Sequence, residues 1–319
     1  MNKSRSFLRL TQLIGVAMFI VIVANIDVAL VLAPLRSLRL EWLALYVLFF
    51  ALSLLAKILR WNVVLKAQRA HLTRGRVASI ALVASFLGSV TPGRVGEVSK
   101  IAYLQQEQMS LAKAAVSVVL DRLYDIAFLC LFGVIGMAYF SSYFLPDIEA
   151  LIFVAVLVSV MVVFVFLLRR RIWDLMKALT RRIVSTETYN GLAQGWDVFR
   201  SELIAASRRT MWAMAGYSIV AHGFFFGQIY VLALGFGLNL PFIYVSLCLA
   251  LSSLVALLPI SIGGLGTREA IFIGLLGKIS VPPESALLLS FTDGVVLGLS
   301  LAALSALIAS WYLKKQVAL

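Results

Sequence analysis

Charged residues are scarce in this sequence. Asp, Glu, Lys and Arg together make up 13% of its 319 residues, whereas an ordinary soluble domain contains about a quarter. Hydrophobic residues make up 62%, and the mean hydropathy is +0.99. Apolar runs that reach the roughly 20 residues needed to cross a bilayer recur along the chain and leave no room for a sizeable soluble domain. The composition therefore predicts a single integral membrane domain over residues 1–319.

The sequence also has few of the residues that usually carry catalysis or bind metals. Cys130 and Cys248 lie in apolar runs without a CxxC partner, which argues against disulfides and structural zinc. His71 and His222 have no second ligand at metal-site spacing, and His222 is expected to be a packed or hydrogen-bonded residue. A Walker A loop, an Asp-x-Asp motif and a nucleophile elbow are absent. We therefore expect no metal, no cofactor, no enzymatic activity and no direct use of ATP.

Acidic residues are outnumbered by basic ones, which gives a net charge of +13. In a soluble protein this excess would suggest nucleic acid, but in a membrane protein basic residues collect on the cytoplasmic side. Basic clusters precede the first apolar run, follow the second run (Trp42 to about Arg60) and end the chain at Lys314-Lys315. Counting crossings between them predicts a multi-pass inner-membrane protein with both termini cytoplasmic and no nucleic-acid binding. Arg60-Trp61 is expected to be an interfacial anchor.

Two further segments are interpreted from the same pattern. The first apolar run, about residues 10–32, is expected to stay as a first helix rather than to be cleaved as a signal. The segment from about 169 to 209 contains the densest basic stretch, RRRIWDLMKALTRR. Because basic amphipathic helices bind anionic headgroups, this segment is predicted to be a cytoplasmic connection that lies at the lipid surface.

Glycine and proline interrupt two of the apolar segments. The first piece, Val77 to Val90, meets TPGRVGE and continues to about Gln105, while a second segment is broken at PISIGGLGTRE between pieces at about 242–258 and 267–276. Each piece is too short to cross a bilayer. A long helix with an acidic residue follows each pair, so the halves at about 77–140 and 242–313 look like copies with inverted topology. We therefore predict an all-α transmembrane bundle with two re-entrant broken-helix pairs; two unrelated kinks are the alternative.

The two interruptions predict an anion-binding site, because a broken helix at membrane depth must be buried in protein or line a wet cavity. Thr91 is expected to cap the second half-helix with Pro92 in its first turn, so that free N–H groups and Arg94 attract an anion. Glu97 could pair with Arg94 or with Lys100. In the second break, glycines allow sharp turns and close approach to a ligand. The candidate substrate-binding residues are Thr91, Gly93, Arg94, Gly96, Glu97, Arg122, Gly263, Gly264, Gly266, Arg268 and Glu269.

Three acidic residues at membrane depth complete the candidate site. Asp121 and Asp125 are four residues apart on one predicted helix, and Asp293 lies in the last one. Ionisable groups within the membrane are costly, so each is a functional candidate. They are interpreted either as coupling residues of the site or as members of an ion-pair network that only holds helices together.

Four motifs in order carry a family resemblance: RWNVVL from Arg60, TPGRVGEVSK from Thr91, LDRLYDI from Leu120 and PISIGGLGTREA from Pro259. Together they resemble the membrane region of the lysylphosphatidylglycerol synthetase and flippase-like family over about residues 10 to 312. One departure is Asp121, where the family pattern usually has Glu. The resemblance implies a bacterial or archaeal membrane protein that moves lipids or lipid-linked groups between leaflets. Synthetase members also carry a soluble C-terminal aminoacyl-transferase domain, and this activity is not expected of a sequence that reaches Leu319 shortly after its last helix.

The leading hypothesis is a lipid transporter or flippase that binds a phosphate headgroup between two opposed half-helix N-termini near Arg94 and Arg268. Its partners would be membrane lipids with anionic headgroups, and coupling to a proton or to the membrane potential is left open. The alternatives are a non-transporting partner of an envelope lipid or glycan enzyme, and an intramembrane transferase that uses a polyprenyl phosphate. A homodimer or an envelope-biosynthesis partner is also considered.

Overall fold

The computed structural model of the chain describes residues 38–139, 201, 207–258 and 261–317. Every regular element in this part of the chain is a helix, which confirms the predicted all-α class. The expected first helix at about 10–32 and nearly all of the expected connection at 169–209 lie outside the described residues.

The long helices are α3 (Leu40–Ala67), α6 (Leu111–Tyr139) and α11 (Arg208–Gly235). A fourth long run is continuous through α14 (Pro283–Phe291), the π-helix η2 (Thr292–Leu299) and α15 (Ser300–Val317). By length and composition, α3, α11 and the run Pro283–Lys315 could each cross a membrane. At a rise of about 1.5 Å per residue, 28 residues reach about 42 Å, more than the roughly 30 Å of a hydrocarbon core. The described residues thus contain several candidate membrane spans.

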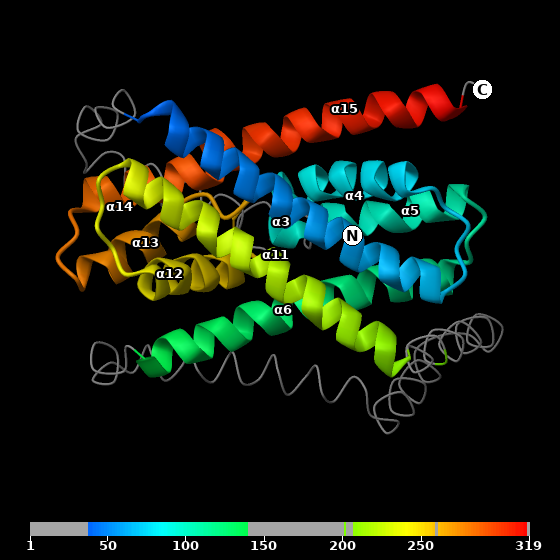
Figure 1. Cartoon of the computed structure of the whole chain (residues 1–319), viewed down its shortest axis with the longest axis horizontal. Coiled ribbons are helices and arrows are strands. Elements are labelled where there is room, and N and C mark those ends of the chain that lie inside the picture. The colour runs from blue at the N-terminus through cyan, green and yellow to red at the C-terminus, as the bar shows by residue number, and fades with distance from the viewer. Residues whose placement is uncertain (1–37, 140–200, 202–206, 259–260, 318–319) are drawn as a thin grey trace, which may run out of the picture.

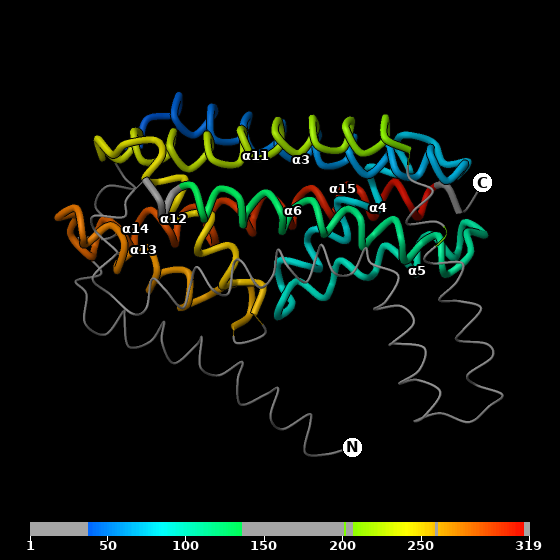
Figure 2. The backbone as a smooth tube through the Cα atoms, turned by 90° about the horizontal axis from the view of Figure 1, so that it is seen from below, coloured from blue at the N-terminus to red at the C-terminus, as the bar shows by residue number. Residues whose placement is uncertain are grey.

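Helices α3 and α11 pack side by side in one layer (Figures 1 and 2). They run antiparallel, because Trp42 near the start of α3 lies against Gly235 at the end of α11, and the Ser53 hydroxyl donates to the Ala221 carbonyl at 2.9 Å. The end of α15 packs against the start of α4 (Arg74–Ser89), where Arg76 donates to the Leu313 carbonyl at 3.3 Å. The chain therefore brings the ends of α3 and α15 and the starts of α4 and α11 to one end of the molecule.

Two hairpins of short helices enter from opposite ends (Figure 1). The first consists of α4, the 3₁₀ segment η1 (Pro92–Val98) and α5 (Ser99–Gln106), and the second of α12 (Phe242–Val255) and α13 (Thr267–Gly277). Their interruptions meet inside the molecule, because a Cβ added at Gly263 would lie 2.5 Å from the Ser89 carbonyl oxygen. Gly263 also has a φ of +61°. Only glycine allows both this backbone conformation and this close approach without strain.

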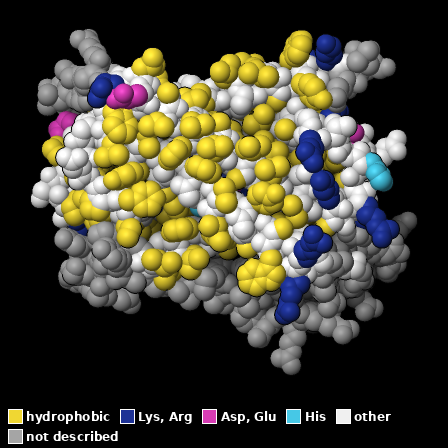
Figure 3. Space-filling model, viewed as in Figure 1, with side chains coloured by type: hydrophobic (Ala, Val, Ile, Leu, Met, Phe, Trp, Pro, Cys, Tyr) yellow, Lys and Arg dark blue, Asp and Glu magenta, His cyan; other side chains and the backbone are white. Residues whose placement is uncertain are grey.

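Two apolar clusters stabilise this arrangement. One joins α6, α11, α12 and α13 around Phe226, Tyr244 and Phe272, and the other joins α3, α4, α5 and α15 around Trp61 and Leu104. Large apolar side chains also cover the outside of α11 and α15, and Figure 3 shows such a surface over α3, α11 and α15 with basic side chains gathered at one edge. An apolar exterior of this extent suits hydrocarbon rather than water.

Candidate functional site

The first interruption places Arg94 in the break itself rather than in a helix. Thr91 is extended, and Gly93 (φ 59°) and Arg94 (φ 56°) are both left-handed. Since left-handed residues cannot continue a right-handed helix, the prediction that Arg94 lies in the first turn of the second half-helix is wrong. Pro92 is the first residue of η1 and follows the extended Thr91, as predicted. Thr91 instead bridges the break: its hydroxyl accepts a hydrogen bond from the Gly96 N–H at 2.8 Å and donates to the Leu87 carbonyl at 2.7 Å.

The second interruption is closed in a similar way. The N–H of Gly266, which precedes α13, donates to Glu269 Oε2 at 2.6 Å, and Thr267 Oγ1 donates to the Gly264 carbonyl at 2.9 Å. At both breaks, then, an N–H group at the start of the half-helix is already bound by a side chain of the protein. Arginine and lysine side chains add positive charge beside these breaks.

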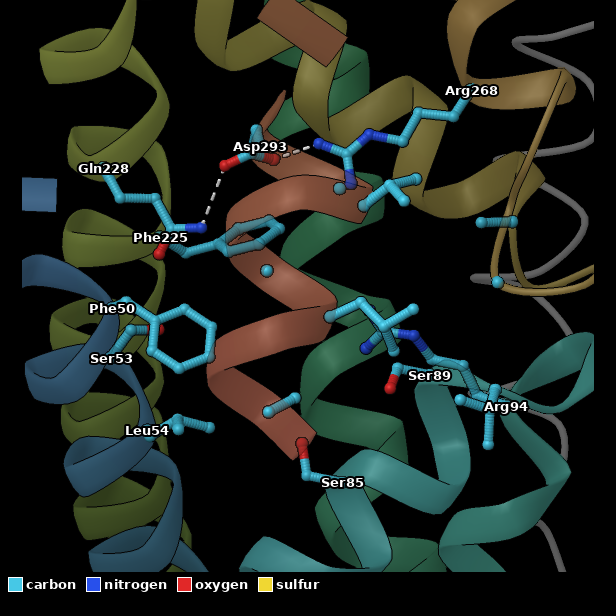
Figure 4. A pocket seen from close by; sticks show the side chains of 18 of the residues that line it. Phe50, Ser53, Leu54, Ser85, Ser89, Arg94, Phe225, Gln228, Arg268 and Asp293 are labelled. Atoms are coloured by element: carbon cyan, nitrogen blue, oxygen red, sulfur yellow. Dashed lines mark hydrogen bonds and ion pairs between the residues drawn. The ribbon is translucent and has the colours of Figure 1, made fainter. Parts of the chain in front are cut away.

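A cavity of about 370 Å³ lies between the two hairpins, α3, α11 and η2. Four ionisable residues line it: Lys57, Arg94, Arg268 and Asp293. Figure 4 shows Arg94 and Arg268 reaching this space from different hairpins. Most of the remaining wall is apolar or small, and includes Phe50, Leu54, Phe225, Ala256, Ile262, Gly263 and Leu265. Of the predicted site residues, the cavity therefore brings together Arg94, Gly263, Arg268 and Asp293.

Asp293 is the ion-pair partner of Arg268. The other Asp293 oxygen accepts hydrogen bonds from the Tyr46 hydroxyl at 2.8 Å and from Gln228 Nε2 at 3.2 Å (Figure 4). A Cβ added at Gly294 would lie 2.8 Å from Arg268 Nη1, so the guanidinium lies directly against this glycine. Asp293 is carried by the π-helix η2, an element often found at functional sites. The geometry fixes the Arg268 side chain in place.

A second ionic cluster lies beside the cavity and is centred on Arg60. This fully buried guanidinium contacts Asp121 Oδ1 at 2.7 Å and Asp125 Oδ1 at 2.8 Å. Lys100 Nζ lies 2.7 Å from Asp121 Oδ2 and 4.8 Å from the centre of the Trp61 ring. The prediction that Arg60-Trp61 anchors the protein at the interface is wrong, because α3 continues to Ala67 and carries both side chains into the interior.

The remaining carboxylate of this cluster, Glu97, pairs with Arg122 and lies 3.7 Å from Lys100. Of the two pairings expected for Glu97, the structure contains the one with Lys100 and not the one with Arg94. Among the residues that the structure describes, Arg94 has no carboxylate within ion-pair distance. Lys57 has only a long contact of 4.0 Å to Asp125. These two cations also line the adjoining cavities of about 40 and 20 Å³.

The predicted residues thus divide into three groups. Those of the large cavity are given above, and those of the ionic cluster line the 40 Å³ cavity: Glu97, Asp121, Arg122 and Asp125. The others line none of these three cavities and shape the two breaks: Thr91, Gly93, Gly96, Gly264, Gly266 and Glu269.

Sequence reasoning missed Lys57, Arg60 and Lys100 as members of the site. Lys57 and Arg60 could have been found from the stretch WNVVL that follows Arg60. It continues the helix beyond Arg60, so both residues lie within α3 and not at its end. His222 is buried, its Nδ1 lies 2.9 Å from the Ser218 carbonyl and its ring stacks on Phe128, which confirms the prediction of a packed residue.

The similarity to known proteins covers both hairpins and the residues that line the large cavity. The lysylphosphatidylglycerol synthase transmembrane region matches residues 10–307 of this chain. A UPF0104 membrane protein of Pyrococcus horikoshii is 21% identical to it over 305 residues, which cover 88% of this chain and 89% of that protein. The chain therefore belongs to the family of lysylphosphatidylglycerol synthase transmembrane regions and is a multi-pass membrane protein.

Proposed function

We propose that this protein is a lipid transporter that moves an anionic phospholipid or lipid-linked headgroup between the two leaflets. The observation that carries the proposal is the 370 Å³ cavity, in which Arg94 has no carboxylate partner among the described residues. A buried or half-buried charge without a counter-ion is costly. An anionic headgroup would supply the missing charge, and the apolar walls would accept the adjoining acyl chains.

The two hairpins support an inverted repeat of re-entrant pairs. Their helices contain 16 residues or fewer, which corresponds to about 24 Å and falls short of the roughly 30 Å of the hydrocarbon core. They enter from opposite ends and meet at Gly263 and Ser89 beside the cavity. Transporters built on inverted repeats bind their substrates at such broken helices and expose the site to each side in turn by rocking one repeat against the other.

The distribution of charge over the described residues supports a cytoplasmic C-terminal end of α15. One end of the molecule is strongly basic (Figure 3). The opposite end, where α3 and α14 begin and α13 ends (Figure 1), carries Arg39, Glu41, Lys278 and Glu284. The basic-residue rule assigns the first end to the cytoplasm, with α4 and α5 entering from that side and α12 and α13 from outside. The described basic residues of this end are Lys66, Arg69, Arg74, Arg76, Lys113, Arg208, Arg209, Lys314 and Lys315.

The contacts of Asp121 and Asp125 favour a holding role over proton coupling. Both carboxylates are buried, and both contact the guanidinium of Arg60. Asp121 is further bound by Lys100. Because cations of other helices bind both carboxylates, these residues are suited to holding α3, α5 and α6 together.

Transport by wild-type and Arg94→Gln proteins tests the proposal. In proteoliposomes with fluorescent phosphatidylglycerol or phosphatidylcholine, the wild type should move the anionic lipid faster. Charge-assisted hydrogen bonds contribute about 1.5–3 kcal/mol. Arg94→Gln should therefore lower the transport of the anionic lipid at limiting lipid concentration by roughly tenfold to hundredfold. Arg94→Lys should restore only part of it, because lysine lacks the planar fork.

Lys66→Gln is the matched control, because Lys66 is exposed at the basic end of α3 and its removal changes the net charge equally. Transport of both lipids at equal rates by all of these proteins would contradict the proposal.

A further inference from the structure

The ionic cluster beside the cavity contains more cations than it can neutralise. Four cations share three carboxylates there: Lys57, Arg60, Lys100 and Arg122 face Glu97, Asp121 and Asp125. The Arg268–Asp293 pair is balanced separately, and Glu269 binds the Gly266 N–H at the start of α13. Within the part of the chain that the structure describes, one cation of the cluster is therefore left without a counter-ion of its own.

The distances identify Lys57 as this cation. Arg60 and Lys100 have carboxylate contacts of 2.7–2.8 Å, and Arg122 is paired closely with Glu97. Among the described residues, Lys57 reaches only Asp125, at 4.0 Å, and that carboxylate already contacts Arg60 at 2.8 Å. The ammonium group of Lys57 also lies over the Phe225 ring at 5.4 Å, at the wall of the large cavity.

Lys57 and Arg94 are thus two uncompensated cations at one place. They come from different elements, α3 and η1, yet both line all three cavities. Arg268 lines only the large cavity, and its charge is cancelled by Asp293. The centre of positive charge for a ligand is therefore between Lys57 and Arg94, not between Arg94 and Arg268.

Two uncompensated positive charges match a ligand with about two negative ones. A phosphate monoester carries about −1.5 to −2 at pH 7, whereas a phosphodiester headgroup carries a single charge. We propose that the preferred ligand of the cavity is a lipid that ends in a phosphate monoester, bound between Lys57 and Arg94. This inference rests on the proposed function, because it requires that a lipid anion enters this cavity.

Binding to the whole purified protein in mild detergent tests the inference. A fluorescent phosphatidic acid serves as the probe, and unlabelled phosphatidic acid and phosphatidylglycerol with the same acyl chains compete with it. Phosphatidic acid should compete at least about tenfold more strongly, because it makes an additional charge-assisted contact. Inorganic phosphate should compete only at far higher concentration, because it lacks chains for the apolar wall.

Variants identify the residues responsible. In the Lys57→Gln protein and in the Arg94→Gln protein, phosphatidic acid should bind no more tightly than phosphatidylglycerol. Lys66→Gln, an exposed change on the same helix, should leave the preference intact. Size-exclusion profiles establish that each variant is folded, and the comparison of lipids on the wild type requires no variant at all.

The outcomes separate this inference from the proposed function. Equal competition by the two lipids, or a preference that survives Lys57→Gln, would overturn the inference, while weakening of both by Arg94→Gln would still support an anionic-lipid site. Competition by inorganic phosphate at lipid-like concentrations would overturn the lipid assignment. Competition by phosphatidylcholine as strong as that by both anionic lipids would overturn the inference and the proposed function together.

Discussion

At the residue scale, three arginines of this protein differ in how completely their charge is compensated. Arg60 contacts two aspartates and the Ser218 hydroxyl, and it is fully buried. Arg268 forms an ion pair with Asp293, which also accepts hydrogen bonds from Tyr46 and Gln228. Arg94 has no carboxylate partner in the described part of the chain. The first arginine is therefore suited to stability, the second to shaping the cavity wall and the third to binding an anion.

Arg60→Gln should lower the free energy of unfolding by about 3–5 kcal/mol, because it leaves Asp121 and Asp125 as buried charges without their main partner. Thermal denaturation of the purified protein, followed by the loss of its monodisperse peak, measures the change. Lys66→Gln on the same helix should have little effect, because the Lys66 side chain is exposed. Equal stability of the two variants would show that the cluster does not hold the helices together.

At the element scale, apolar length and helix-breaking residues made most boundaries predictable. The observed α4 (Arg74–Ser89), α12 (Phe242–Val255) and α13 (Thr267–Gly277) differ from the predicted pieces by a few residues, since Gly, Pro and polar residues mark their ends locally. The end of α3 was placed too early at Arg60, because a charged residue after an apolar run was interpreted as the membrane boundary.

The ion pairs of the site were much less predictable than its elements. Whether Glu97 pairs with Arg122 or Arg94 depends on where η1 places its side chains relative to α6, and Gly93 and Arg94 form a left-handed turn within η1. Such contacts between distant elements leave no periodic signal in one sequence. Thr91, Gly263 and Arg268 could be singled out because they belong to unusual Gly- and Pro-containing stretches, whereas Lys57 has no such neighbours.

Gly263→Ala tests whether the contact between the two hairpins matters. A left-handed alanine costs about 1–2 kcal/mol by itself, and here its Cβ would also lie 2.5 Å from the Ser89 carbonyl oxygen. We expect an additional loss of roughly 1–3 kcal/mol, as for other overpacked positions. Gly237→Ala is the matched control, because Gly237 has a φ of +73° but no atom within 4 Å of an added Cβ. Equal losses in thermal stability for the two variants would mean that the close contact between the hairpins does not contribute to stability.

At the scale of the whole molecule, the described helices carry apolar side chains on their outside and charged side chains between them. Exposed side chains such as Ile219, Leu307 and Trp311 suit contact with hydrocarbon, while the ionic cluster and the cavity lie within the helices. Charges inside a bundle, at the meeting point of two broken hairpins, are typical of sites that carry polar groups through a membrane. In the proposed transport, a headgroup would bind inside the protein while its chains stay near the lipid.

Cysteine labelling in intact cells tests how this molecule lies in the membrane. Ser110 is exposed between α5 and α6 at the basic end, and Asn239 is exposed between α11 and α12 at the opposite end. Because basic residues stay in the cytoplasm, Asn239→Cys should react with a membrane-impermeant maleimide, and Ser110→Cys should react only after permeabilisation. Cys130 and Cys248 are buried and should give little background. The reverse pattern would contradict the assigned orientation. Labelling of both cysteines from the same side would be more serious, because the hairpins would then not enter from opposite sides and the inverted repeat would lose its support.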